Sequence, residues 1–269
     1  MDESERPQLK QFAFLGINEA FNDKLNVLKN LAEKENWTSR GSTYENDILY
    51  RYVMHTFDRI ESEDKIIYTK DGKYASFNTG LLTEMGEDIV ALFSRNMNPD
   101  KEKWYLDGFV CLSDRKFAEK FNEDPQVAEY FDKPEMMYFN PNYKIIVNIS
   151  HILGDNIDRF PPKLATQGRN YLVTLFSGAL ELTKRKIKRN YRLVVPQYYD
   201  RRITYLLPLV IDDFKCALAI ELLNNEQYRA NTILTLDMAY SNARLLMKPE
   251  SDWLNINFEG NEENNKEQE

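Results

Sequence analysis

Short turns between strand-like runs constrain the fold of this chain more than any other feature. Asp71-Gly72 is a strong turn dipeptide between one pair of such runs, and Asp212-Asp213 is an equally short turn between another pair. Strands joined so closely pair antiparallel, because a parallel pair needs a crossover connection of roughly a dozen residues or more. The expected strands are 65–68, 74–77, 88–95, 104–112, 191–196, 203–211 and 215–223.

Helical periodicity marks the segments on either side of these strands. Phe21, Leu25 and Leu28 recur at intervals of four and three, which predicts a helix at 17–34. The run 143–153 fits a strand by its β-branched residues and a helix by the spacing of its isoleucines. Further helices are expected at 44–60, 117–121, 164–189 and 232–246, with a loop at 224–229.

These elements together predict an α+β fold, in which an antiparallel or mixed sheet has helices packed on it. We expect a single large domain over residues 13–258, flanked by flexible polar tails at 1–12 and 259–269. The acidic, loop-rich segment 122–136 is the only candidate for a division of the chain.

The composition excludes several classes of protein. No apolar run approaches the roughly 20 residues of a membrane span, and the N-terminus lacks the pattern of a signal peptide. We therefore expect a cytoplasmic protein with no membrane partner. Cys111 and Cys216 are too far apart for a metal-ligand motif and are expected to be buried thiols. No metal site is expected, and no motif identifies a cofactor, a phosphate loop, a Rossmann fingerprint or a serine-hydrolase elbow.

Positive charge is concentrated in one segment of an otherwise acidic chain. The formal net charge is −8, yet residues 184–202 hold eight basic residues and one acidic residue. The candidate phosphate-binding residues in this segment are Lys184, Lys186, Arg189, Arg201 and Arg202. Charge combined with stacking rings is how single-stranded nucleic acid is bound, and four tyrosines interleave with the charges, namely Tyr191, Tyr198, Tyr199 and Tyr205. The alternative is a solvated helix end, whose charges the helix dipole favours.

The predicted helix 232–246 is apolar on most sides and is therefore expected to be buried. Asp237, Ser241 and Arg244 nevertheless share one stripe of it. In a functional interpretation, Arg244 holds a phosphate or carboxylate and Asp237 binds a hydroxyl or orients a base, with Asn242 as a further ligand-binding residue. In a structural interpretation, each charge pairs elsewhere and orients the helix.

Three phrases of the sequence resemble a known family, an uncharacterised bacterial domain of unknown function numbered 3825. They are LYRYVMHTFDRI at 49–60, ASFNTGL at 75–81 and TILTLDMAYSNAR at 232–244. The similarity spans about residues 40–255, which is most of the chain. The resemblance implies no established activity. Related domains are sometimes joined to small RNA-binding modules, which favours RNA as a ligand.

A histidine and an arginine one helical turn apart form a candidate catalytic pair. His55 is suited to proton transfer near neutral pH, and Arg59 could stabilise negative charge developing on a phosphate. The second histidine of such a reaction would have to be His151. The alternative is that His55 is a structural residue of its helix.

Asn78 and Thr79 lie where a predicted strand runs into a bend at Gly80. Residues at such strand ends commonly bind ligands. The alternative is an ordinary turn in which Asn78 bonds its own backbone.

The sequence therefore predicts a protein that binds RNA or a nucleotide through the segment 184–202. It also predicts hydrolysis of a phosphoester, by a hydrolase or ribonuclease in which His55, Arg59 and Asp237 are catalytic. The competing prediction is a non-catalytic interaction or regulatory module that forms a homodimer through its tyrosines.

Overall fold

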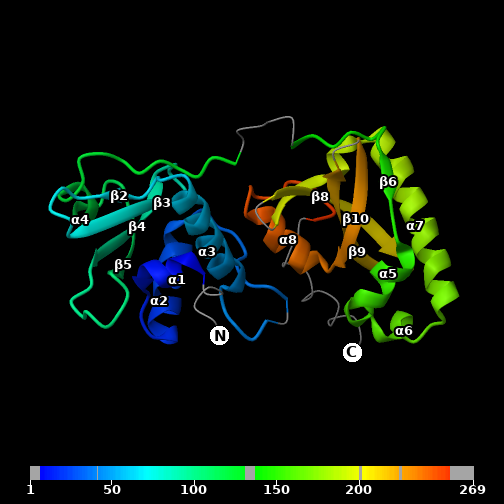
Figure 1. The fold of residues 1–269 in the computed structure, drawn as a ribbon, viewed down its shortest axis with the longest axis horizontal. Helices are drawn as coiled ribbons and strands as arrows, with labels where there is room; N and C mark the ends of the chain where they lie inside the picture. The colour runs from blue at the N-terminus through cyan, green and yellow to red at the C-terminus, as the bar shows by residue number, and fades with distance from the viewer. Residues whose placement is uncertain (1–6, 41, 131–136, 200–201, 224–225, 255–269) are drawn as a thin grey trace, which may run out of the picture. The chain divides into compact units, whose positions relative to one another are not determined.

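The computed structural model describes residues 7–40, 42–130, 137–199, 202–223 and 226–254 (Figure 1). The chain divides into two compact units, Met1–Tyr130 (unit 1) and Phe131–Glu269 (unit 2). The boundary falls inside the acidic segment 122–136, where the sequence places its candidate for a division. Each unit has its own sheet and is described by itself.

Unit 1 is built on a mixed five-stranded sheet in the order β1-β5-β4-β3-β2. The β2–β3 hairpin turns at Gly72, whose φ of 67° is a conformation that glycine adopts without strain. Neighbouring strands pair antiparallel except β1 and β5, which are parallel. The strands are β1 (Ala13–Phe14), β2 (Ile67–Tyr68), β3 (Tyr74–Leu82), β4 (Asp88–Arg95) and β5 (Trp104–Cys111).

Helices cover the two faces of this sheet unequally. On one side lie α1 (Gln8–Phe12) and α3 (Asp47–Ser62), and on the other lies the short α4 (Arg115–Ala118) (Figure 1). α2 (Asn18–Leu31) packs against β5. Aromatic rings fill the larger interface, where Phe57 of α3 packs edge-on against Phe77 of β3. Because side chains alternate along a strand, the residues on either side of Phe77 point toward α4.

Unit 2 has a second mixed five-stranded sheet, in the order β6-β10-β9-β8-β7. β7 to β10 pair antiparallel, and β6 joins the edge parallel to β10. The turn between β8 and β9 contains Asp212, whose φ is 55°. The strands are β6 (Lys144–Ile146), β7 (Val195–Tyr199), β8 (Arg202–Ile211), β9 (Phe214–Leu223) and β10 (Gln227–Leu234).

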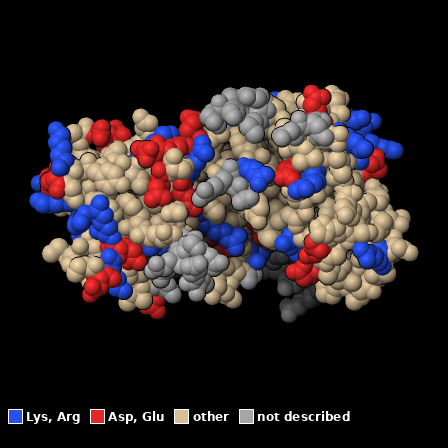
Figure 2. Space-filling view, in the orientation of Figure 1, with Lys and Arg blue, Asp and Glu red and all other residues tan. Residues whose placement is uncertain are grey.

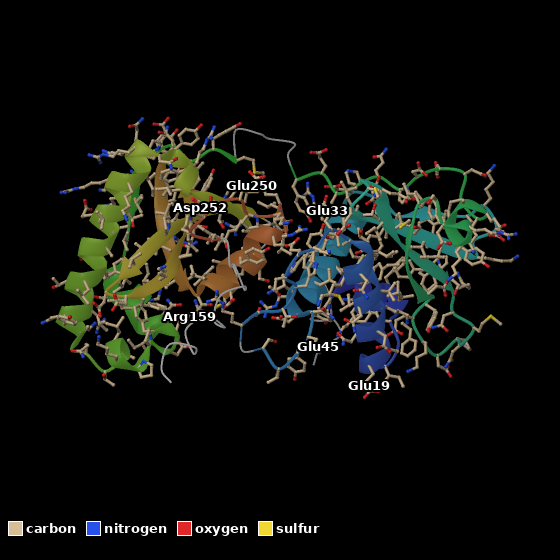
Figure 3. All side chains as sticks on the ribbon, turned by 180° about the vertical axis from the view of Figure 1, so that it is seen from behind. Glu19, Glu33, Glu45, Arg159, Glu250 and Asp252 are labelled. Atoms are coloured by element: carbon tan, nitrogen blue, oxygen red, sulfur yellow. The ribbon has the colours of Figure 1, made fainter. Side chains whose placement is uncertain are left out.

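The unit 2 sheet has helices on both faces. α5 (Ile149–Asp155), α6 (Pro162–Ala165) and α7 (Arg169–Arg189) share one apolar core with alternate residues of β8, β9 and β10. α8 (Leu236–Arg244) packs instead against β7, β9 and β10 from the other face. Arg159, labelled in Figure 3, ends the 3-10 helix η3 (Ile157–Arg159) and donates from Nη1 to Thr232 Oγ1 at 3.0 Å.

The predicted α+β class is confirmed, with mixed sheets that carry packed helices. The ambiguous run 143–153 contains a strand and then a helix, since β6 is followed by α5. β10 was not predicted, and it takes up the first residues of the expected helix 232–246, so that α8 begins only at Leu236. Of the described helices, none is long and apolar enough to cross a membrane.

The N-terminal tail differs from the prediction. Residues 8–12 form α1, because Leu9 is fully buried and the ring of Phe12 packs on Phe57 at a centroid distance of 5.0 Å. The expected C-terminal tail, 259–269, lies outside the described residues.

Candidate nucleic-acid interface

The strongest concentration of positive charge in unit 2 is the C-terminal end of α7 and the residues after it. α7 buries one stripe of apolar side chains, which includes Phe176, Leu180 and Ile187, so its remaining sides face solvent. The solvent-facing cations form a group that we call the α7 basic end: Lys184, Arg185, Lys186, Lys188, Arg189 and, in the following 3-10 helix η4 (Tyr191–Leu193), Arg192. Figure 2 shows Lys and Arg side chains gathered over this end of α7.

The α7 basic end is largely unneutralised. Lys184 Nζ lies 2.7 Å from Glu181 Oε1, and it is the one member of the group with a carboxylate within ion-pair distance in the described part of the chain. A hydrogen bond from Lys184 and its positive charge lower the pKa of Glu181, with smaller contributions from Arg185 and Lys188. The helix dipole stabilises cations at a C-terminus, which explains part of the cluster but not its exposure or its size.

The tyrosines of the segment do not act together. Tyr191 and Tyr199 are 51% and 63% exposed and offer ring faces to solvent. Tyr205 is 2% exposed in the core between α7 and the sheet, where burial raises its pKa to about 12. The sequence prediction is therefore wrong for Tyr205, because alternation along β8 turns this ring inward.

Arg202 does not join the α7 basic end. It lies in β8 at an odd spacing from Tyr205, so its side chain leaves the opposite face of the sheet from α7. There Glu221 forms an ion pair with Arg229 at 2.6 Å and a longer one with Arg202 at 3.7 Å. Arg201 lies outside the described residues.

α8 occupies that same face of the unit 2 sheet. Asn242 donates from Nδ2 to Gln197 Oε1 at 3.1 Å, and Gln197 donates in turn to Thr204 Oγ1 at 2.9 Å. This chain of polar contacts fastens α8 to β7 and β8, so Asn242 has a structural role. No sequence signal marked Gln197, which is 2% exposed within an apolar strand.

The charged stripe of α8 has a simple structural basis. Asp237 lies in the first turn of the helix and Arg244 in the last turn, and both are half-buried. An acid at the N-terminus and a base at the C-terminus each complement the helix dipole. Ser241 between them is buried, and α8 places the two charges at its two ends rather than together.

In unit 1, Asn78 and Thr79 stabilise a bulge of β3. The pairing of β3 with β4 shifts between Asn78 and Leu82, and Gly80 has a φ of 72° there. The side chains replace the missing ladder bonds: Asn78 Nδ2 donates to Asp88 Oδ1 at 3.0 Å, and Thr79 Oγ1 donates to the Ile89 carbonyl at 2.6 Å. Both residues are buried, which agrees with the interpretation of this segment as a turn rather than a ligand-binding site.

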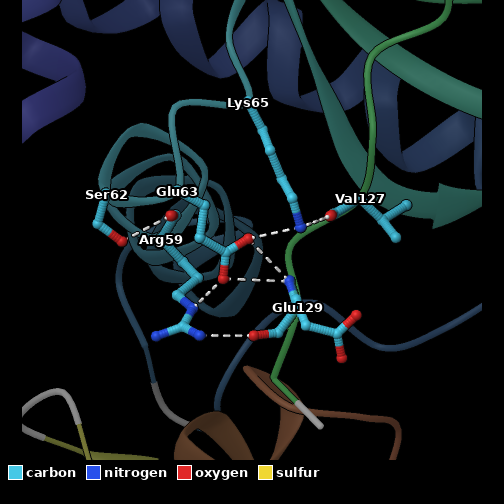
Figure 4. Close-up of polar contacts among 6 residues, drawn as sticks. All are labelled: Arg59, Ser62, Glu63, Lys65, Val127 and Glu129. Carbon is cyan, nitrogen blue, oxygen red and sulfur yellow. Dashed lines mark hydrogen bonds and ion pairs between the residues drawn. The ribbon is translucent and has the colours of Figure 1, made fainter. Parts of the chain in front are cut away.

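Arg59 is likewise engaged within unit 1 (Figure 4). Its Nε forms an ion pair with Glu63, and its Nη2 donates to the Glu129 carbonyl at 2.6 Å. Glu63 also pairs with Lys65 at 2.8 Å and accepts from the Glu129 backbone N–H at 3.0 Å. Lys65 donates to the Val127 carbonyl at 2.9 Å. These contacts hold segment 127–129 against the end of α3.

The two histidines lie in different units. His55 is exposed on α3, where loss of solvent around the ring lowers its pKa, Asp58 opposes that effect and Arg51 adds to it. His151 is exposed on α5, with Nδ1 3.3 Å from Asp155 Oδ2. Across the described ranges, no three His, Cys, Asp or Glu side chains come together as metal ligands.

The predicted site residues thus belong to two units. His55, Arg59, Asn78 and Thr79 lie in unit 1, and the remaining described candidates lie in unit 2. Within unit 2 they separate again. The α7 basic end lies on one face of the sheet. The candidates of β8 and α8 lie on the other face, namely Arg202, Asp237, Asn242 and Arg244. The cationic residues at 185, 188 and 192 belong to the α7 basic end, and the regular spacing of charges along the helix was the signal for them.

Comparisons with known proteins place the chain in one family. None of the curated proteins and none of the solved structures matches it. The family described as a domain of unknown function (DUF3825) matches residues 28–253, a span that includes α3, the β3 bulge, the α7 basic end and α8. The chain belongs to this family.

Proposed function

We propose that this protein binds RNA, or a nucleotide of the same chemistry, through the α7 basic end. The observation that carries the proposal is a group of six cationic side chains within nine residues, five of them exposed and Lys184 half-buried, with one carboxylate as their only ion-pair partner in the described chain. The chain as a whole has a net charge of −8, so a polyanion is drawn only to surfaces where positive charge is concentrated, and the α7 basic end is such a surface.

The chemistry of the group suits phosphate. Arginine offers a planar fork of donors and lysine a compact charge, and both release condensed counterions when they contact a nucleic-acid backbone. Tyr191 lies within the α7 basic end and Tyr199 follows it in β7, and both have exposed rings on which a base could stack.

Hydrolysis of a phosphoester stays a prediction from the sequence. Its three residues, His55, Arg59 and Asp237, come from both units, and Arg59 already pairs with Glu63. We therefore confine the proposal to binding.

The α7 surface also supports the competing proposal of an interaction module that forms a homodimer. Tyr171 and Leu182 are 51% and 53% exposed and lie eleven residues apart, which places them on one side of α7. Exposed tyrosine and leucine side chains in a stripe are typical of helix-mediated interfaces. This alternative predicts a stable dimer and no salt-dependent binding of polyanions.

A salt titration separates the two proposals. The test is the affinity of a labelled single-stranded RNA for the full chain, measured by fluorescence anisotropy at several salt concentrations. A variant with Lys186, Lys188 and Arg189 changed to Gln removes three exposed charges, and a matched control changes Lys144, Lys215 and Lys248, which are also exposed. If each lost cation contacts one phosphate, the slope of log affinity against log salt falls by about 2.

The outcome decides the proposal in either direction. A reduced slope in the α7 variant, with little change in the control, supports binding at the α7 basic end. Equal affinities for the two variants would contradict it, and binding that ignores salt would exclude phosphate contacts altogether.

A further inference from the structure

A row of aromatic side chains crosses the unit 1 sheet on the face opposite α1 and α3. Strand register places Tyr74 of β3 beside Ser94 of β4, Ser94 beside Tyr105 of β5, and Tyr105 beside Phe14 of β1. The rings of Phe14 and Tyr105 are 6.1 Å apart between centroids. Three rings therefore lie along one line that runs across four strands.

This row is left partly open by the neighbouring helix. Phe117 of α4 and Phe121 after it pack on Val90 and Leu92, and they cover the adjoining part of the same face. Tyr74 touches the edge of that cluster, while Phe14 and Tyr105 lie beyond it. All three rings are half-buried, so each has its base fixed in the sheet and a part that solvent reaches.

A lysine ammonium group lies over each ring. The distances from Nζ to the ring centroid are 5.0 Å for Lys120 over Tyr74, 4.9 Å for Lys24 over Tyr105 and 5.5 Å for Lys101 over Phe14. These lysines come from three separate segments of the chain. Figure 2 shows Lys and Arg side chains, with Asp and Glu among them, over the part of the molecule that Figure 1 assigns to α4 and the outer face of this sheet.

One carboxylate belongs to the same face. Asp107 is exposed on β5 and accepts a hydrogen bond from Ser94 Oγ at 2.8 Å. Partial loss of solvent around the carboxylate raises its pKa, while the hydrogen bond from Ser94 and the charges of Lys120, Lys24 and Lys116 act in the opposite direction. Lys24 and Lys120 thus lie over rings of the row and also act on this carboxylate.

We propose that this row, which we call the unit 1 aromatic row, binds single-stranded nucleic acid by stacking bases on Phe14, Tyr74 and Tyr105 while the lysines contact phosphates. Aromatic rings on the open face of a sheet are a recurrent platform for splayed bases, since every base has a π face. The flanking cations supply the charge complementarity that a phosphate backbone needs. The site is distinct from the α7 basic end and stands on its own observations.

The lysines over the rings do not prevent stacking. A cation–π contact at an exposed site is weaker than the stack of a base on an aromatic ring, so a base can displace the ammonium group. Lysine side chains are flexible, and a displaced ammonium group remains within reach of the phosphate that arrives with the base. Each ring thus exchanges a cation–π contact for a stronger stack with a base, and each ammonium group exchanges the ring for a phosphate.

The experiment compares two ligands of the full chain, a labelled single-stranded oligouridine RNA and a labelled inorganic polyphosphate that has charge but no bases. The test variant is Tyr74→Leu with Tyr105→Leu, which keeps apolar cover on the sheet and removes both rings. Its matched control, Tyr74→Phe with Tyr105→Phe, keeps the rings and removes only the hydroxyl groups. We expect the leucine variant to bind RNA at least fivefold more weakly for each ring lost, the lower end of what one stack contributes. Polyphosphate affinity should be unchanged, and the phenylalanine control should bind both ligands as the original chain does.

A second variant guards against loss of folding. Lys101→Gln with Lys120→Gln leaves the rings in place, and Lys101 and Lys120 are both at the surface. It should weaken RNA binding mainly by reducing the salt dependence. RNA affinity that is unchanged in the leucine variant would overturn the proposal, whatever the glutamine variant shows.

The result also separates this site from the α7 basic end. Failure of the α7 proposal appears as full RNA affinity in the variant of Lys186, Lys188 and Arg189, whatever the ring variants do. Failure of the unit 1 aromatic row appears as full RNA affinity in the leucine variant. A chain that binds no RNA at all contradicts both.

Discussion

Glu63 forms an ion pair with Arg59, four residues earlier on α3, and this pair anchors a segment far away in sequence. The backbone of Glu129 bonds to both partners, to the arginine through its carbonyl and to the carboxylate through its N–H. Arg59, which the sequence predicts to be a phosphate-binding residue, therefore has a structural role: it holds the segment around Glu129 against the end of α3.

Glu63→Gln is expected to lower the free energy of unfolding by up to about 1 kcal/mol, as for a partly exposed ion pair. Burial raises the pKa of Glu63, but Lys65, the Glu129 N–H and Arg59 outweigh it, so the net pKa is lowered. A carboxylate with a lowered folded-state pKa stabilises the fold at neutral pH, and that stability is lost as the pH falls through the acidic range. Chemical denaturation at pH 7 and at acidic pH measures both effects.

Glu61 provides the control on the same helix. Burial and the charge of Asp58 raise the pKa of Glu61, so its carboxylate is disfavoured in the folded state. Glu61→Gln should leave the stability at neutral pH unchanged or slightly higher. A loss as large as that of Glu63→Gln would show that the Arg59 network is not the cause.

Asn78→Ala is expected to destabilise unit 1 by about 2 kcal/mol, because it removes hydrogen bonds at a buried position and leaves their partners unsatisfied. Asn78 Nδ2 bonds Asp88 and the Pro125 carbonyl, and its Oδ1 accepts from Gly80. Thermal unfolding measures the effect. Asn142→Ala, at an exposed position, should change stability by less than about 0.5 kcal/mol.

The local elements could be predicted from the sequence wherever one pattern dominates. The β2–β3 hairpin follows from Asp71-Gly72, and α3 follows from its apolar stripe at Leu49, Val53 and Phe57. β10 could not be separated from the helix after it, because Thr232, Ile233 and Leu234 suit either state. Its strand conformation is imposed by pairing with β9, a contact between distant segments.

The candidate site could be predicted only in part, for a similar reason. The α7 basic end is local in sequence, so its charge pattern was sufficient to find it. Arg59 forms an ion pair with Glu63, and Arg202 forms one with Glu221, so neither arginine is held for a ligand alone. The pair of Arg202 and Glu221 joins the neighbouring strands β8 and β9, which no local pattern shows. The unit 1 aromatic row joins four strands by register, and register is set by tertiary pairing rather than by any local pattern.

Thr235→Ala is expected to destabilise unit 2 by about 1 kcal/mol, the usual cost of removing an N-cap side chain. Thr235 Oγ1 accepts from the Met238 backbone N–H at 3.3 Å and caps α8, with Asp237 in the first turn. Ser and Asp at this position should restore most of the stability, since both cap helices well. Calorimetry of the three variants measures it, and equal losses for all three would exclude capping.

His55 is expected to titrate below the ordinary histidine pKa of about 6.5. Loss of solvent is the main cause, Asp58 raises the pKa and Arg51 lowers it. Asp58→Asn should therefore lower the pKa of His55 further, and Arg51→Gln should raise it. Because the folded state favours the neutral ring, protonation opposes folding, and stability should fall as the pH drops below the unfolded-state pKa. NMR titration of the His55 ring in the three proteins measures these shifts. A His55 pKa above 6.5, a pKa raised by Asp58→Asn or a pKa lowered by Arg51→Gln would contradict this account of its surroundings.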